Sequence, residues 1–375
     1  MPITVRPIAG SRELELFIAL PLHLSDRRPN QVPPLLADER ELHDIQRNLS
    51  AQGCEVAHWF AEREGRIVGR VVGIVHGPYN RRHGERTARF FQLDAESDPS
   101  VVRALLDQVE TWARERGMTR IIGPYGFSDK DPQGLQVEGF EHLPVLATPT
   151  NAAHLPKAVE ACGYLPFADA LSYRLDMPAQ LPEIHQRIAE RVLRNGRFRV
   201  VELRSKRDLR PWILPVLRLV NDTYSDLLGF APMSEAEMRK LAGQYMPVLD
   251  PALVKIVAEG QEPVAFVVAM PDMSAGLQRA KGRLFPFGWW HIMQAMKRSK
   301  QLDLFLGAVR RDLQGMGLTC VLARELFREG RARGMTHLDS HLVLENNVRM
   351  RAELERLGGE IWKRYRVYVK ELCGS

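Results

Sequence analysis

The stretch of this chain best suited to hold an anion is a glycine-bearing loop between an apolar strand, 302–309, and an amphipathic helix. Glycines allow backbone N–H groups to converge and let a ligand approach closely. The start of the helix adds N–H groups without intrahelical acceptors and the positive end of the helix dipole. A strand–helix turn with a purely structural role is the alternative interpretation. We predict a phosphate-binding loop made of Val309, Arg310, Arg311, Gln314, Gly315, Met316, Gly317, Leu318 and Thr319.

A second group of polar side chains follows the apolar strand 120–122, on a loop rich in glycine and proline. Ligands commonly bind on loops at the carboxyl ends of strands in α/β folds. Carboxylates there could hold an amine or accept its proton, although capping of turns by Asp and Ser is a competing interpretation. We predict that Ser128, Asp129 and Asp131 bind a substrate and that Glu138 takes part in catalysis.

A third segment combines aromatic and basic side chains. Residues 284–293 read Leu-Phe-Pro-Phe-Gly-Trp-Trp-His-Ile-Met, and three cations follow within seven residues. Aromatic rings beside cations suit a membrane interface. The segment could instead line an acyl pocket or pack between two parts of the chain. The substrate-binding residues predicted here are Phe285, Phe287, Trp289 and Trp290.

The chain repeats itself once, and the repeat predicts the elements that carry these segments. Residues 114–119 read Arg-Glu-Arg-Gly-Met-Thr and residues 331–336 read Arg-Ala-Arg-Gly-Met-Thr, each between an amphipathic helix and an apolar strand. An internal duplication of this kind implies that the two halves have the same fold. Each half reads as strand, helix, hairpin, strand, loop, helix, strand, helix, strand, which predicts an α/β protein with mixed-sheet (α+β) layers. We predict two domains, 1–178 and 198–375, joined by a linker helix within 179–197.

Composition narrows the partners and the compartment. The chain has 375 residues and a net charge of +6, which favours anionic partners. No zinc-finger spacing or aromatic RNA-binding signature is present, so we expect no nucleic acid. No signal-peptide-like region and no apolar run long enough to span a bilayer occur, so we expect a cytoplasmic protein. The cysteines are too scattered for a metal site or a disulfide framework, so we expect no metal: Cys54, Cys162, Cys320 and Cys373.

The element order and the loop resemble the GNAT superfamily of acyl-CoA N-acyltransferases. In that family the phosphate loop is Gln or Arg, two residues, Gly, one residue, then Gly or Ala; Gln314, Gly317 and Thr319 occupy these places, the last as a departure. Asn347 stands eleven residues before Gly358, as in the family's Asn-to-Gly segment. The resemblance implies two tandem GNAT-like domains, with acyl-CoA bound by the second through the predicted loop and Asn347.

The first half lacks this loop. Its equivalent stretch, 94–100, reads Asp-Ala-Glu-Ser-Asp-Pro-Ser, and its negative charge would repel a pyrophosphate. The resemblance therefore implies that the first domain is degenerate and has lost donor binding. Tandem GNAT proteins with one degenerate half, such as mycothiol synthase, have this arrangement.

Catalysis by this chain departs from the family's common pattern. Leu354 occupies the place where many members have a tyrosine that protonates the leaving thiolate. Tyr365 or Tyr368 could substitute for it, or both could simply pack in their strand. The acceptor amine must lose a proton, which Asp303 or His341 could take, although a single histidine is more often structural. The catalytic candidates are His341, Asp303, Tyr368 and Glu138.

The acceptor is predicted from position and from a narrower resemblance. In GNAT folds the region after the first helix lies over the acceptor, which implies Tyr224 and Asp226 as substrate-binding residues. Segments 123–140 and 270–288 resemble a family of bacterial tandem GNAT proteins, and this resemblance covers nearly the whole chain. Some related proteins are associated with bacterial ceramide synthesis, in which a sphingoid amine is N-acylated.

The resemblance implies transfer of an acyl group from acyl-CoA, or from an acyl carrier protein, to an amine of long-chain or sphingoid type. We expect contact with an anionic membrane at the inner face of the cytoplasmic membrane. A GNAT acyltransferase acting on a soluble amine, amino acid or cell-wall precursor is one alternative. A non-catalytic protein that binds an acyl thioester is the other.

Overall fold

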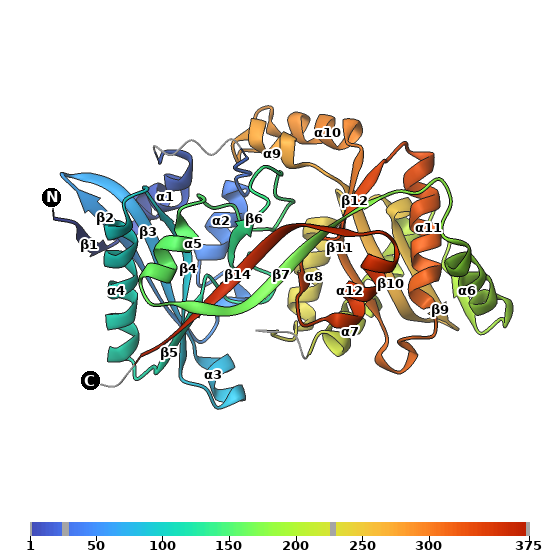
Figure 1. Ribbon diagram of the computed structural model, residues 1–375, viewed down its shortest axis with the longest axis horizontal. Coiled ribbons are helices and arrows are strands. Elements are labelled where there is room, and N and C mark those ends of the chain that lie inside the picture. The colour runs from blue at the N-terminus through green and yellow to red at the C-terminus, as the bar shows by residue number, and fades with distance from the viewer. Residues whose placement is uncertain (1, 25–29, 226–229, 373–375) are drawn as a thin grey trace.

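The computed structural model describes residues 2–24, 30–225 and 230–372. Within these residues, fourteen strands form one mixed sheet, with helices packed against its faces (Figure 1). The first half runs β1 (Thr4–Pro7), α1 (Gly10–Ala19), α2 (Leu36–His43), β2 (Cys54–Arg63), β3 (Arg66–His76), α3 (Gly77–His83), β4 (Thr87–Ala95), α4 (Pro99–Glu115), β5 (Arg120–Gly123), β6 (Leu135–Glu138), α5 (Leu155–Ala161) and β7 (Leu165–Asp176).

The second half repeats this order after a connecting helix and adds a helical pair in the middle. Its elements are α6 (Glu183–Arg194), β8 (Phe198–Val200), α7 (Lys206–Thr223), α8 (Glu235–Tyr245), β9 (Val254–Glu259), β10 (Glu262–Pro271), α9 (Ser274–Ala280), α10 (Gly288–Arg298), β11 (Gln301–Val309), α11 (Leu318–Ala332), β12 (His337–Asp339), β13 (Val343–Leu344), α12 (Val348–Arg356) and β14 (Glu360–Glu371).

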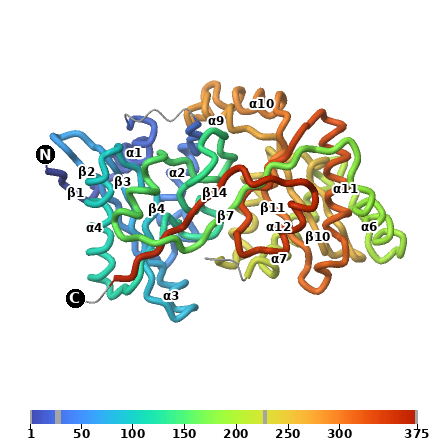
Figure 2. The backbone as a smooth tube through the Cα atoms, viewed as in Figure 1, coloured from blue at the N-terminus to red at the C-terminus, as the bar shows by residue number. Residues whose placement is uncertain are grey.

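The two halves exchange their last strands. The sheet order is β1-β2-β3-β4-β5-β14-β7-β12-β11-β10-β9-β8, so β14 completes the sheet of the first half and β7 completes that of the second. These two long strands also pair with each other, and they run from one half into the other (Figure 2). The boundary predicted at 178 falls just after β7, and the division into domains stays a prediction.

Local sequence signals explain where the main helices begin and what they cover. Asp98 caps α4 by accepting a hydrogen bond from Ser100 N at 2.9 Å, and Pro99 takes the first helical position, a combination suited to a helix start. The apolar face of α4 packs on the first half of the sheet, and the apolar face of α11 packs on the second. Within the described part of the chain, every helix is too short or too polar to traverse a bilayer.

A buried network of polar side chains lies in the first half. His43 Nδ1 lies 2.9 Å from His58 Nε2, and His43 Nε2 lies 2.9 Å from Gln92 Oε1. Gln92 Nε2 donates to Glu39 Oε2 at 2.7 Å. Burial lowers the pKa of His43 to about 3 and the pKa of His58 to about 4. Both rings are therefore neutral in the folded protein at neutral pH.

These two histidines should make the fold sensitive to acid. In the unfolded chain they titrate near the ordinary pKa of about 6.5, so unfolding takes up protons below that pH. The free energy of unfolding should be fully retained above pH 6.5 and should fall by roughly 2 kcal/mol per histidine by pH 5. His58→Gln should flatten this slope, measured by denaturant unfolding across the pH range. The exposed His83→Gln is the control, and an unchanged slope in His58→Gln would contradict this prediction.

Candidate active site

The candidate site lies where β11 and β12 diverge. These parallel strands pair only over residues 301–303 and 337–339. Beyond that point the chain turns away, and the short strand β13 pairs with β7 instead. On its other side, β11 continues to Val309 against β10, with an irregularity that leaves Phe305 outside the register. A bulge of this kind re-aims backbone groups, and the divergence leaves backbone groups of β11 without a neighbouring strand on the β12 side.

A fully buried carboxyl group stands at the closed end of this divergence. Asp303 is completely buried, and its Oδ1 accepts a hydrogen bond from Gln301 Nε2 at 2.8 Å. Its Oδ2 has no hydrogen-bond partner among the described residues. Burial, together with the neighbouring Asp272 and Asp339, raises the pKa of Asp303 well above its usual range. The protonated form of Asp303 is therefore favoured, and its unpartnered oxygen is free to carry that proton.

The neighbouring carboxylate, Asp339, is bonded by side chains from the two strands that cross from one half to the other. Asp339 lies opposite Asp303 in the sheet and is also fully buried. Its Oδ1 accepts from Ser172 Oγ at 2.7 Å, and its Oδ2 lies 2.6 Å from Lys363 Nζ. Lys363 Nζ also donates to the carbonyl of Leu143 at 3.1 Å. Because Ser172 belongs to β7 and Leu143 to the first half, both halves build this site.

A neutral histidine faces the same divergence. His341 follows β12 with φ 57°, and its backbone N–H donates to Asp339 Oδ1 at 2.8 Å. Its Nε2 lies 3.1 Å from the carbonyl oxygen of Leu146, and its ring lies 5.5 Å from that of Phe305, centroid to centroid. A carbonyl only accepts, so we assign the proton to Nε2 and leave Nδ1 as an acceptor. Burial lowers the pKa of His341, which keeps the ring neutral and able to take a proton.

The predicted phosphate loop lies at the other end of β11. Gly317 is the N-cap of α11 and provides no side-chain cap, so the N–H groups of the first helical turn keep their capacity to bind an anion. Gly315 and Gly317 have φ values of 81° and 88°. A Cβ on Gly315 would meet nothing within 4 Å, whereas a Cβ on Gly317 would lie 2.3 Å from Ile188 Cγ2. Gly315 therefore faces open space, and Gly317 allows close packing against α6.

The two arginines at this loop, Arg310 and Arg311, have different bonding partners. Arg310 forms ion pairs with Glu259 at 2.9 Å and Asp312 at 2.8 Å. Arg311 donates to Ser225 Oγ at 2.6 Å and also to the backbone of α7. Two local carboxylates therefore already neutralise much of the charge of Arg310.

A further cation at the loop was not predicted. The exposed Arg349 of α12 donates to Gln314 Oε1 at 3.0 Å, which puts a guanidinium beside the loop. Asn347 caps α12 by accepting from Met350 N at 3.2 Å. Thr319 Oγ1 of α11 lies 3.4 Å from Glu353 Oε2, which also belongs to α12. The sequence carries no signal for Arg349, because its place depends on how α12 packs beside α11.

Replacing Gly317 with alanine should destabilise the second half. The substitution imposes a left-handed backbone on a side-chain-bearing residue, which costs about 1–2 kcal/mol, and drives its Cβ into Ile188. We expect a lower free energy of unfolding by about 2–4 kcal/mol in denaturant titration. Adding Ile188→Ala should recover the steric part in the double variant. If Gly317→Ala unfolds like the parent chain, the packing role assigned to this glycine is wrong.

The first-half loop shows turn-stabilising contacts. Asp131 Oδ2 accepts from Phe127 N at 2.7 Å and from Ser128 N at 3.0 Å. Asp129 Oδ1 accepts from Lys130 Nζ at 3.1 Å and from the backbone N–H of Ala231 at 3.3 Å. The loop thus contacts the second half after α7. These bonds are those of the capping interpretation, and substrate binding by Ser128, Asp129 and Asp131 stays a prediction.

The remaining predicted residues are spread over the molecule. Tyr368 is buried in the first-half core, with its hydroxyl 3.2 Å from Glu160 Oε1. It lies opposite Pro166 on β7, whereas Asp339 lies opposite Arg174, a separation of about 26 Å along the strand. The structure therefore does not bring Tyr368 to the β11–β12 divergence.

Glu138 lies at the surface, 3.3 Å from Arg364 Nε, and Tyr224 donates its hydroxyl to the carbonyl of Gly307 on β11 at 2.9 Å. Asp226 lies outside the described residues. The predicted aromatic residues are all exposed and lie on or just before α10: Phe285, Phe287, Trp289 and Trp290.

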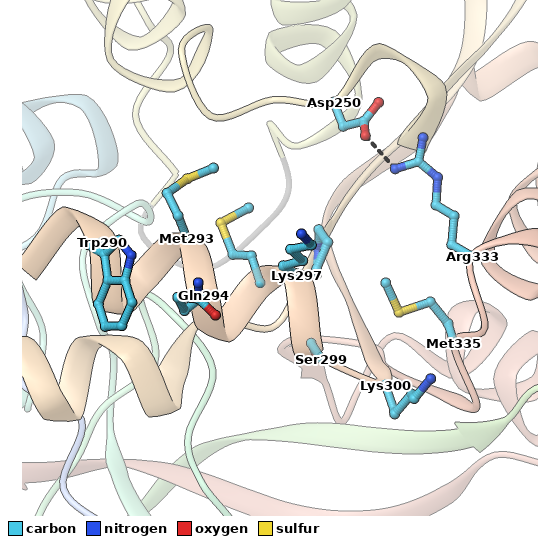
Figure 3. Close-up of a pocket in the computed structure, with 11 residues that line it drawn as sticks. Asp250, Trp290, Met293, Gln294, Lys297, Ser299, Lys300, Arg333 and Met335 are labelled. Carbon is cyan, nitrogen blue, oxygen red and sulfur yellow. Dashed lines mark hydrogen bonds and ion pairs between the residues drawn. The ribbon is translucent and has the colours of Figure 1, made fainter.

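A pocket of about 490 Å³ lies beside α10 (Figure 3). Trp290, Met293 and Lys297 of α10 line it, and Arg333 with its partner Asp250 closes the far side. It also touches Pro271, which pairs with Leu302, one position from Asp303. The predicted phosphate loop starts at Val309, about 23 Å beyond Leu302 along β11. The pocket is therefore close to the carboxyl pair and distant from the loop.

Comparison with known proteins identifies relatives of the chain. No family model matches it. It is 31% identical over 378 residues to bacterial ceramide synthase of Caulobacter vibrioides, covering 99% of this chain and 98% of that protein. It is 28% identical over 390 residues to protein YghO of Escherichia coli, covering 98% of this chain and 95% of that protein.

Two solved structures share the fold across the full chain. A tandem GNAT protein from the clavulanic acid biosynthesis pathway superposes with a TM-score of 0.54 at 14% identity, covering 100% of both chains. A GCN5-related N-acetyltransferase from Sphaerobacter thermophilus superposes with a TM-score of 0.52 at 12% identity, covering 99% of this chain and 96% of that one. The predicted tandem GNAT-like fold is thereby confirmed. The chain belongs to the family of the bacterial ceramide synthase of Caulobacter vibrioides and is an acyltransferase of tandem GNAT architecture.

Proposed function

We propose that the protein transfers an acyl group from acyl-CoA to the amino group of a long-chain, sphingoid-type lipid. The observation that carries the proposal is the neutral His341 beside the diverging strands, with Nδ1 left as an acceptor. An acyl transfer to an amine needs a group that removes a proton from the attacking nitrogen. His341 supplies that group, because its other ring nitrogen is held by Leu146.

The open backbone of β11 supplies the second requirement. As the amine attacks, negative charge develops on the thioester oxygen, and fixed N–H donors stabilise that charge. N–H groups of β11 near Phe305, outside the regular pairing, are the donors we propose. Asp303, whose raised pKa favours the protonated form, offers a proton beside them. The C–N bond forms as the C–S bond breaks, and no covalent enzyme intermediate is required.

The residues of the second half suit the phosphates of the donor. The uncapped start of α11, the open side of Gly315 and the guanidinium of Arg349 converge on one loop. A helix N-terminus of this kind binds phosphate groups. An acyl carrier protein is the alternative source of the acyl group, and the basic surface of the chain would suit it equally.

The choice of a lipid amine rests on two supports. The relative that is 31% identical is named a bacterial ceramide synthase. The pocket near Asp303 is lined by methionine and tryptophan side chains together with lysines, a combination that suits an amphiphile. An acceptor of this kind is reached at a membrane, on the cytoplasmic side where acyl-CoA is available.

The test measures thiol release from palmitoyl-CoA and identifies the N-acyl product by mass spectrometry. The purified protein is offered a sphingoid amine in detergent, and water-soluble amines or amino acids in parallel. Turnover with the sphingoid amine supports the proposal. Turnover with soluble amines alone would overturn the lipid acceptor. Turnover only with a palmitoylated carrier protein would overturn acyl-CoA as the donor.

A further inference from the structure

A helical pair inserted between β10 and β11 carries an unusual surface. Residues 273–300, here called the docking hairpin, contain α9, α10 and the turn between them. The hairpin lies along the upper edge of the molecule, outside the sheet (Figure 1). Residues 273–302 contain six Lys or Arg and no Asp or Glu. This segment alone therefore carries a positive charge equal to the net charge of the whole chain, +6.

The cations of the hairpin are exposed and available. None of the six forms an ion pair with a residue that the structure describes. Exposed cations near an anionic bilayer each strengthen binding by about 1 kcal/mol. They are Arg279, Lys281, Arg283, Lys297, Arg298 and Lys300.

Large apolar side chains project from the same hairpin. Phe285 and Phe287 in the turn are 79% and 70% exposed. Trp289, Trp290 and Met293 at the start of α10 are 50%, 48% and 54% exposed. Five neighbouring apolar groups of this size rarely face water without a partner, and aromatic rings flanked by cations are typical of the bilayer interface.

The hairpin is held firmly on the protein, so its exposed side is presented in a fixed orientation. Gly276 lets the helices approach, because a Cβ there would lie 2.6 Å from Ile292 Cα. The hairpin is also tied to the first half: Gly282 O accepts from Leu36 N at 2.8 Å, and Ser274 Oγ donates to Pro144 O at 2.9 Å. These contacts anchor α9 and the first part of the turn, and they leave Phe285 and Phe287 exposed.

We propose that the docking hairpin seats the protein on an anionic phospholipid bilayer, with the aromatic turn in the interface and the cations against the headgroups. The inference rests on the proposed function, since a lipid acceptor must be collected from a membrane. The pocket shares Trp290, Met293 and Lys297 with the hairpin and reaches Pro271, beside the strand position of Asp303. In a docked protein this pocket therefore lies beside the bilayer, and an amphiphile could pass from the bilayer into the pocket.

The test is co-sedimentation of the full chain with vesicles of phosphatidylcholine alone, or with about one third phosphatidylglycerol. We expect at least about tenfold stronger binding to the anionic vesicles. Lys297→Glu with Arg298→Glu should weaken binding by about fivefold or more per charge. Phe285→Ser with Phe287→Ser should weaken it by about tenfold. Leu165→Ser with Ile184→Ser, which removes two apolar residues that are 66% and 60% exposed elsewhere, is the matched control and should bind as the parent does.

Equal binding to both vesicle types, or unchanged binding by the Phe285→Ser/Phe287→Ser variant, would overturn the proposal. So would an absence of vesicle binding combined with hairpin-dependent binding to an acidic carrier protein. Activity separates this inference from the proposed function. If the parent binds anionic vesicles yet acylates no amine in detergent, only the proposed function fails. If it acylates the amine in detergent but binds no vesicles, only the docking proposal fails.

Discussion

Replacing His341 with asparagine should lower kcat by about 10²–10⁴-fold, the usual contribution of a general base, with the affinity for palmitoyl-CoA unchanged. Asparagine is the appropriate substitution because His341 has φ 57°, and asparagine adopts this left-handed conformation more readily than most residues. The variant keeps the backbone N–H bond to Asp339 and removes the proton acceptor. The exposed His23→Asn carries the same chemical change elsewhere and should leave kcat unchanged.

The pH dependence of the reaction gives an independent measurement. Burial lowers the pKa of His341, so the ring stays neutral, and active as a base, to a pH below the ordinary value of about 6.5. In the parent protein the rate should fall on the acid side only below that value, after allowance for protonation of the amine itself. The acid limb should disappear in His341→Asn. If the limb remains, or if kcat falls by less than about threefold, His341 is not the base and water takes the proton instead.

The elements around the site followed from local sequence, because their signals lie within a few residues of one another. The loop after β11 has a strand before it, glycines within it and an amphipathic helix after it, and the structure shows an uncapped helix start there. Asp303 lies in the predicted strand 302–309, and the parallel pairing of β11 with β12 places it opposite Asp339, two residues before His341. Periodicity and turn chemistry are enough for such predictions.

The strand exchange could not be predicted in the same way. Tyr173 and Tyr368 occupy matching places in β7 and β14, so either strand can complete either half of the sheet on local grounds. Only the pairing across about two hundred residues decides it. That choice carries Ser172 and Lys363 to Asp339 and buries Tyr368 far from them. A residue's role at this site therefore depends on a long-range contact that no short motif encodes.

The same dependence on long-range contacts explains why the position of Arg349 and the bonding of Asp131 could not be predicted from the sequence. Arg349 reaches Gln314 because α12 packs beside the phosphate loop, whereas the sequence shows only one basic residue among several in that helix. Asp131 was predicted from its residue type and place, and its Oδ2 accepts from two backbone N–H groups of its own turn. Carboxylates that stabilise a turn and carboxylates that hold an amine are identical in sequence, and only their bonding partners differ.

Placing one negative charge in the phosphate loop should cost more donor affinity than any neutral change there. Gly315 is the suitable position, since a Cβ would meet no atom within 4 Å and the side chain would project into open space. Its φ of 81° is left-handed, which aspartate and asparagine both tolerate better than most residues. Gly315→Asp and Gly315→Asn therefore have the same shape and nearly the same backbone cost, and they differ in charge.

The difference between these two variants measures the phosphate interaction alone. We expect Gly315→Asn to weaken palmitoyl-CoA binding by about threefold and Gly315→Asp by about 30–100-fold, because an added carboxylate within about 4–6 Å of a phosphate repels it. Isothermal titration with palmitoyl-CoA and with CoA measures the affinities of both variants. Raised salt should reduce the difference between these affinities, because it screens the charges. If the two variants bind the donor equally, the pyrophosphate does not lie in this loop. The donor would then have to be held elsewhere along the diverging strands, and acyl transfer at His341 would need a different approach of the thioester.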